Sequence, residues 1–170
     1  MLCGAALASA GCGYSLAGRG AFLPAYIQTI GVPLFSNNTN VFDVEQVLTQ
    51  QVRQEFIGRG KYRVVPDATG VDALLTGTVS SVTVSPVAYN DRQQATRYAV
   101  VVVMRFQFRD QRANAVIWEN PSLVFREEYD LESDRTQVDA QTFFGQESNA
   151  IQRLAENFSK SVVTSILEAF

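Results

Sequence analysis

Apolar and polar residues alternate with period two over residues 97–110, the pattern of a β-strand with one buried face. The apolar positions of this stretch are Val100, Val102, Met104, Phe106 and Phe108. Arg105, Gln107 and Arg109 occupy the intervening positions and therefore share the opposite face. The length of the apolar run places this strand at or near the centre of a sheet.

Weaker alternation predicts further strands on both sides of this one. They lie over residues 26–35, 61–65, 73–84, 115–119 and 123–129. A change of phase at Ser80–Ser81 indicates a β-bulge, and Asn120–Pro121 interrupts the last strand. The polar stretch Pro86–Arg92 is typical of a turn.

Two stretches, Val41–Ile57 and Glu147–Leu167, repeat apolar residues every three or four positions and predict amphipathic helices. A capping box of Asn40 and Asp43 would start the first helix, and Gly58 and Gly60 would end it. Phe143–Phe144 precedes the second helix as a hydrophobic staple, or as an exposed partner contact. Because the elements do not alternate as βαβ units, we expect an α+β fold: a mixed four- to five-stranded sheet with two amphipathic helices packed on one face.

Composition restricts the chemistry that the chain can perform. The sequence has 170 residues, no histidine, two cysteines and a net charge of −3. These counts exclude Ser-His-Asp and Cys-His catalysis and a zinc site with nitrogen and sulfur ligands, and they disfavour nucleic acid as a partner. No metal or other cofactor is expected. Glu127, Glu128 and Asp130 are the carboxylates that a hydrolase would use, but no apolar pocket around them is evident in the sequence.

The first 18 residues carry no charge and include the small-residue run Ser9-Ala10-Gly11 before Cys12. This pattern indicates a lipoprotein signal peptide over residues 1–11, with Cys12 as the lipidation site and residues 12–25 as an acylated linker. No basic residue precedes the apolar stretch, which leaves a truncated or misassigned start open. The alternative is that Cys12 is a free thiol or is paired with Cys3. Residues 26–170 would form a single domain.

The stretch Gly11-Cys12-Gly13-Tyr14-Ser15-Leu16, followed by Leu23-Pro24, resembles the start of LPS-assembly lipoproteins of the LptE family. Further similarities are Val32-Pro33-Leu34-Phe35, Asp72-Ala73-Leu74-Leu75-Thr76-Gly77, Arg97-Tyr98 and Ile117-Trp118. The resemblance implies an outer-membrane, periplasm-facing lipoprotein without enzyme activity. Its main expected partner is the lipopolysaccharide translocon, a β-barrel of the LptD type, in which it acts as plug and assembly factor. The other expected partners are lipopolysaccharide itself and the membrane that holds acylated Cys12.

The same resemblance implies lipopolysaccharide contacts at the hairpin before the long strand, where Arg92 and Arg97 lie. A solvated loop arginine is the alternative role for Arg92. Arg105, Gln107 and Arg109 form a polar strand face that suits the hydrophilic lumen of a barrel, although a solvent-facing sheet would look the same. Two other functions stay open: a periplasmic lipoprotein similar to CsgG or to a penicillin-binding-protein activator, and a carboxylate hydrolase.

Overall fold

The computed structural model describes residues 23–59, 61–130 and 140–169, with the backbone alone for residues 140–147. Its elements follow the order β1 (Thr29–Gly31), β2 (Ser36–Asn37), α1 (Val44–Gly58), β3 (Arg63–Val65), β4 (Ala73–Tyr89), β5 (Ala95–Asp110), β6 (Ala115–Asp130) and α2 (Ala140–Leu167). Leu23 is buried in the core, so the folded part already includes the residues just before Tyr26.

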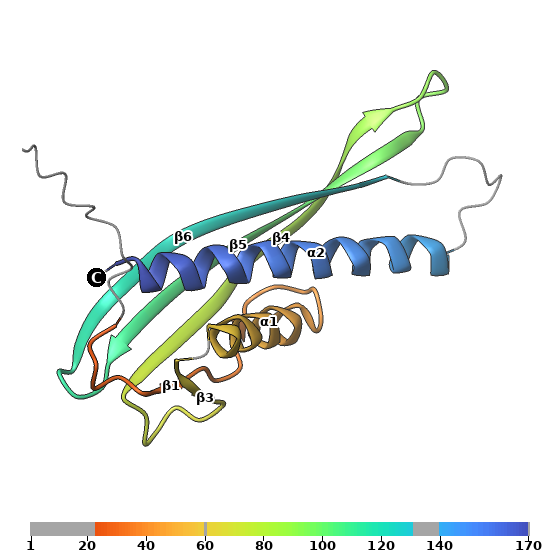
Figure 1. The fold of residues 1–170 in the computed structure, drawn as a ribbon. Helices are drawn as coiled ribbons and strands as arrows, with labels where there is room; N and C mark the ends of the chain where they lie inside the picture. Colours follow the sequence, from red (N-terminus) through yellow and green to blue (C-terminus); the bar gives the residue numbers. More distant parts are fainter. Residues whose placement is uncertain (1–22, 60, 131–139, 170) are drawn as a thin grey trace, which may run out of the picture.

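The strands form one mixed sheet in the order β3-β1-β4-β5-β6, with β2 also paired to β4. The short strands β1, β2 and β3 pair in parallel, whereas β4, β5 and β6 form long antiparallel pairs. Both helices lie on the same face of this sheet (Figure 1). The expected fold class is therefore confirmed. The strand expected over residues 26–35 is two short strands, which end at Gly31 and Asn37 and bring the sheet to six.

The core lies between the helices and the face of β5 that the alternation identified. Val100, Val102, Met104, Phe106 and Phe108 are each at most 1% exposed. Around Phe106 the packing is so close that a Cβ atom on Gly77 would lie 2.7 Å from its ring, which explains glycine at that position. The α2 residues Leu154, Phe158, Val162 and Ile166 cover this face, as the helical periodicity predicted.

The start of α1 differs from the expected capping box. The helix begins at Val44, and Asp43 takes the left-handed conformation at φ 66° without a side-chain cap bond. The turn before it is held by Asn37 instead, whose amide donates to the Val41 carbonyl and the Glu45 carboxylate at 2.8 Å. The capping box of Asn40 and Asp43 is therefore wrong, because the chain uses these residues in a turn.

Other boundaries also differ from expectation. β4 continues through Pro86 to Tyr89, and α2 begins at Ala140 rather than Glu147, so Phe143 and Phe144 lie inside it. The register shift between Val79 and Ser81 confirms the predicted bulge. Asn120–Pro121 does not end the strand but lies at a second shift, between Met104 and Phe106 of β5.

β4 and β5 extend past the end of β6, which stops at Asp130 opposite Arg97 (Figure 1). We call residues 86–97 of this hairpin the arm and the rest of the described chain the body. The arm has no buried residue. The opposite end of the body, where residues 23–28 and the β5–β6 turn lie, is the entry end. With about 3.3 Å per residue, the 17 residues of β4 place the tip of the arm roughly 55 Å from the entry end.

Candidate functional site

The tip of the arm is a turn organised by one asparagine. The Asn90 carboxamide oxygen accepts from the backbone N–H groups of Arg92 and Gln94, both at 3.0 Å. The backbone N–H of Gln93 donates to the Asn90 carbonyl at 2.9 Å, and Gln93 has φ 60°. The Arg92 side chain is exposed, and within the described residues no hydrogen bond or ion pair holds its guanidinium. Arg92 is thus presented to solvent on an ordered turn.

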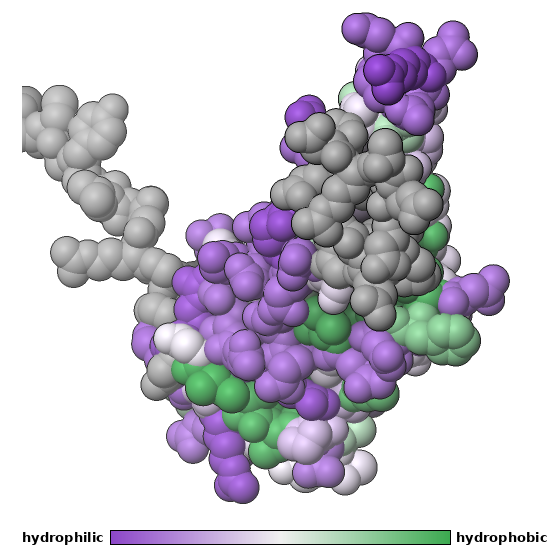
Figure 2. All heavy atoms as spheres, turned by 90° about the vertical axis from the view of Figure 1, so that its right-hand side faces the viewer, coloured by the Kyte–Doolittle hydropathy of each residue, from purple (hydrophilic) through white to green (hydrophobic). Residues whose placement is uncertain are grey.

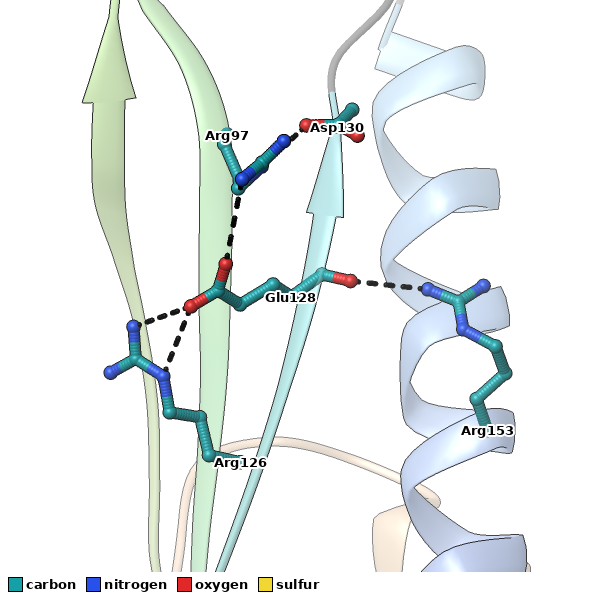
Figure 3. Close-up of polar contacts among 5 residues, drawn as sticks. All are labelled: Arg97, Arg126, Glu128, Asp130 and Arg153. Atoms are coloured by element: carbon teal, nitrogen blue, oxygen red, sulfur yellow. Dashed lines mark hydrogen bonds and ion pairs between the residues drawn. The ribbon is translucent and has the colours of Figure 1, made fainter.

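Arg97, the second lipopolysaccharide candidate, has a different environment. Its guanidinium lies 2.6 Å from Asp130 and 3.9 Å from Glu128 (Figure 3). The hydrogen bond to Asp130 raises the pKa of Arg97. The Arg97 guanidinium is therefore charged and already paired with a carboxylate. The structure therefore separates the two candidates: Arg92 offers an uncommitted guanidinium at the tip, and Arg97 lies at the base of the arm inside an ion-pair network.

The carboxylates considered for hydrolysis belong to the same network. Glu128 also accepts from Arg126 at 2.8 Å, and Glu127 accepts from Arg153 of α2 at 2.9 Å. Arg153 reaches the Glu128 carbonyl as well, so it ties α2 to the edge strand β6 (Figure 3). Surface carboxylates paired with arginines form an ion-pair cluster, and the charges of these three groups are already matched by arginine partners.

The three barrel-contact candidates share the face of the sheet that the helices leave open. Arg105 is exposed, and no partner for it is found in the part of the chain that the structure describes. Gln107 lies between Thr76 of β4 and Glu119 of β6. Arg109 differs from both, because its guanidinium donates to the side chain and carbonyl of Asn114 in the β5–β6 turn, at 3.2 and 3.4 Å.

A polar cluster at the entry end has no counterpart in the sequence-based candidates. Asp110 is 1% exposed and accepts from the Tyr26 phenol and from the backbone N–H groups of Arg112 and Ala113. Burial alone would raise the pKa of Asp110, but these hydrogen bonds outweigh it and lower that pKa. The Asp110 hydrogen bond in turn raises the pKa of the Tyr26 phenol.

Asp72 completes this cluster. Its carboxylate accepts from the backbone N–H groups of Thr29 and Gln28, which lower its pKa, and it lies 3.2 Å from Arg112. Arg112 also stacks over the Tyr26 ring at 5.4 Å. The cluster joins the first described residues to the β5–β6 turn, and residues 84 positions apart cannot be paired from sequence periodicity.

Two further features bear on interactions. Figure 2 shows the arm as a hydrophilic projection above a body with apolar patches. Phe42, before α1, is 90% exposed and borders a groove of about 480 Å³ between α1 and α2. Within residues 23–59, 61–130 and 140–169, neither helix combines the length and hydropathy of a membrane span.

The predicted lipidation site Cys12 and the signal and linker residues up to 22 lie outside the described residues. The same holds for the side chains of Phe143 and Phe144.

Comparison with known families finds one that matches most of the described chain. A family model described as "LptE: Lipopolysaccharide-assembly" matches residues 27–166. The chain belongs to the LptE family. The match spans every described strand and both helices almost to the end of α2, and it agrees with the resemblance found in the sequence. No curated protein sequence matches the chain.

Solved structures share the fold at low identity. Lipoprotein B from Nitrosomonas europaea aligns with a TM-score of 0.58 and 9% identity, over 91% of this chain and 90% of that one. A lipoprotein from Caulobacter crescentus aligns at 0.54 with 10% identity, over 78% and 87%. The PelC dodecamer from Paraburkholderia phytofirmans aligns at 0.51 with 15% identity, over 88% and 95%. At these identities the likeness shows the fold alone.

Proposed function

We propose that the protein is a non-catalytic lipoprotein of lipopolysaccharide assembly, anchored in the outer membrane, which binds a β-barrel of the LptD type as plug and assembly factor. The observation that carries this proposal is the LptE family match over residues 27–166, which names the process. Binding then requires a surface for the barrel, a group for lipopolysaccharide and an anchor.

The open sheet face is the surface proposed for the barrel. Arg105 lies opposite Thr78, and Gln107 lies opposite Thr76, so guanidinium, amide and hydroxyl groups alternate across neighbouring strands. A barrel interior is polar, and a protein seated in it needs hydrogen-bonding groups rather than an apolar surface. Within the described residues the Arg105 guanidinium has no ion-pair partner, which makes it the strongest single contact candidate on this face.

Arg92 is the group proposed for lipopolysaccharide. A guanidinium matches phosphate oxygens in a bidentate geometry and keeps its charge at every working pH. Val87 and Tyr89 belong to the same arm, are 39% and 61% exposed, and supply apolar contact area of the kind that a lipid requires. Arg97, at the base of the arm, would bind a phosphate after giving up its ion pair with Asp130.

Cys12 is the proposed anchor. Two or three acyl chains on this residue would hold the protein on a membrane, because each buried methylene contributes about 0.8 kcal/mol and one chain alone binds only marginally. Intact-mass spectrometry of the wild-type protein tests the assignment directly, since acylation adds the mass of its chains to a product that begins at Cys12.

The barrel proposal is tested by co-purification from cells that express Arg105→Glu. We expect recovery of the barrel to fall about tenfold, the effect of losing roughly 1.4 kcal/mol of contact energy. Lys160→Glu is the matched control, because it reverses one exposed charge on α2, away from the open face. Equal recovery with both variants, at equal expression, contradicts the assignment of this face. Depletion of the protein should lower surface lipopolysaccharide, and unchanged levels with a correctly assembled barrel contradict the function.

Arg92→Glu tests the lipopolysaccharide contact separately. Capture of purified lipopolysaccharide should fall about tenfold while the barrel is still recovered. Capture at the wild-type level contradicts the role of Arg92.

Self-assembly into a ring is a second candidate function, favoured by the similarity of the fold to that of the PelC dodecamer. Light scattering of the purified protein distinguishes the two. A monomer, or a complex with one barrel, supports lipopolysaccharide assembly, and a dodecamer supports the ring.

A further inference from the structure

A groove at the entry end lies beside the point where the chain enters the body. Its volume is about 580 Å³, and Leu23 and Ile27 form its floor with 4% and 3% of their surface exposed. Lys61, Tyr62 and Arg63 form one rim. Burial raises the pKa of the Tyr62 phenol, so this rim residue stays neutral. The groove therefore combines an apolar floor with two exposed cations.

Two acidic groups of the entry end, Asp72 and Asp110, have partners outside the groove rim. Asp72 accepts from the backbone of Gln28 and Thr29 and pairs with Arg112, and Asp110 is buried under the Tyr26 phenol. The Arg63 backbone N–H donates to the Gln28 carbonyl at 2.8 Å, which fixes this residue beside β1. Within the described residues no carboxylate lies in ion-pair contact with the Arg63 guanidinium, so its charge is available to an external anion.

We propose that this groove seats the headgroup of an anionic phospholipid, with the phosphate at Arg63 and the glycerol and upper acyl carbons over Leu23 and Ile27. Anionic lipid surfaces attract exposed basic residues over about a Debye length. The chain from Cys12 to Leu23 spans at most roughly 38 Å when fully extended, so the groove belongs to the part of the fold that an anchor at Cys12 keeps closest to the membrane. The arm, with Arg92, lies at the other end.

The inference rests on the proposed function in one respect, the presence of Cys12 at a membrane, and its test is independent of acylation. The full chain carrying Cys12→Ser is sedimented with vesicles of phosphatidylcholine, or of equal parts phosphatidylcholine and phosphatidylglycerol. We expect more protein on the anionic vesicles, and a roughly tenfold lower partition for Arg63→Glu. Residues 1–22 are present in every variant, so their contribution cancels.

Two matched variants sharpen the test. Lys160→Glu changes the net charge by the same amount at an exposed position outside the groove and should bind as the parent does. Arg63→Lys should keep most of the binding because it retains the charge. Equal losses for Arg63→Glu and Lys160→Glu, or equal binding to both vesicle types, overturn the proposal. Displacement by inorganic phosphate, beyond that caused by sodium chloride at the same ionic strength, would indicate a free-phosphate site and overturn the membrane assignment.

These outcomes are distinguishable from failure of the proposed function. If the wild-type mass shows a bare Cys12 while the groove binds anionic vesicles, the anchor is wrong and the groove stands. If Cys12 is acylated and the vesicle test fails, the groove is wrong and the anchor stands.

Discussion

The body and the arm are built from the same two strands, β4 and β5, yet they are stabilised in different ways. In the body every second residue of β5 from Val100 to Phe108 is buried under the helices. In the arm no residue is buried, and the two strands are joined by their backbone ladder and the Asn90 turn. Burial therefore stabilises the body, whereas the arm contributes no side chain to the core and presents its side chains to solvent.

This division has consequences for local stability. An isolated two-stranded hairpin is marginal in water, whereas a sheet face covered by helices unfolds as a unit. Irregular pairing adds to the difference, because register shifts occur on both sides of Ala88 in the arm. We therefore expect the arm to open without the body, and changes in the two regions to have effects of different size.

The largest effect should come from Phe106→Ala in the body. The Phe106 ring lies 5.4 to 6.4 Å from the ring centroids of Phe35, Phe158 and Trp118. Removing it leaves a cavity that these rings cannot fill, so we expect the free energy of unfolding to fall by about 3–5 kcal/mol in urea denaturation. Tyr89→Ala, at an arm residue 61% exposed, should change it by less than about 0.5 kcal/mol. Similar losses for the two variants would contradict the division into body and arm.

Sequence periodicity predicted the body well because burial imposes it. A strand with one covered face needs apolar residues at every second position, and Val102, Met104 and Phe106 satisfy this requirement. The end of β4, Pro86–Tyr89, was expected to belong to a turn for the same reason. Val87 and Tyr89 have no core to face, so the strand there is held by backbone pairing and leaves no alternating pattern.

The sequence indicated which residues could form a site, but it did not show which groups surround each of them. Arg92 and Arg97 were equivalent in sequence, but Arg97 is paired because the β5–β6 register places it opposite Asp130. Such a register depends on the whole sheet and cannot be obtained from period two alone. The entry-end cluster was missed for a related reason, since Tyr26 and Asp110 come together only through the order of the strands.

A smaller effect is expected from Asp110→Asn at the entry end of the body. Because the pKa values of Asp110 and Asp72 are lowered in the folded state, both carboxylates stabilise the fold above the ordinary carboxyl range. That contribution is lost as the pH falls through this range towards their folded pKa values. Asp110→Asn should cost about 2 kcal/mol at pH 7, measured by urea denaturation, because a hydrogen-bonded charge is removed.

The same variant should lose less stability than the wild type on acidification, since one of the two titrating groups is gone. Asp91→Asn removes an exposed carboxylate of the arm and should keep the wild-type stability at pH 7. If the free energy of unfolding falls by the same amount in Asp110→Asn and in the wild type from neutral to acid pH, this carboxylate is not a source of the acid sensitivity.

The smallest global effect, and the sharpest test of the division, should come from Asn90→Ala in the arm. This change removes the acceptor of the Arg92 and Gln94 backbone N–H groups and about 1 kcal/mol of turn stability. Because no core residue depends on this turn, the urea midpoint should stay unchanged, while hydrogen exchange at Gln94 and Gln93 becomes about fivefold faster. Asn90→Asp keeps a side-chain acceptor and should preserve most of the protection. A midpoint that moves with the exchange rates would mean that the arm unfolds together with the body, and that its exposed residues are held by the same cooperative core.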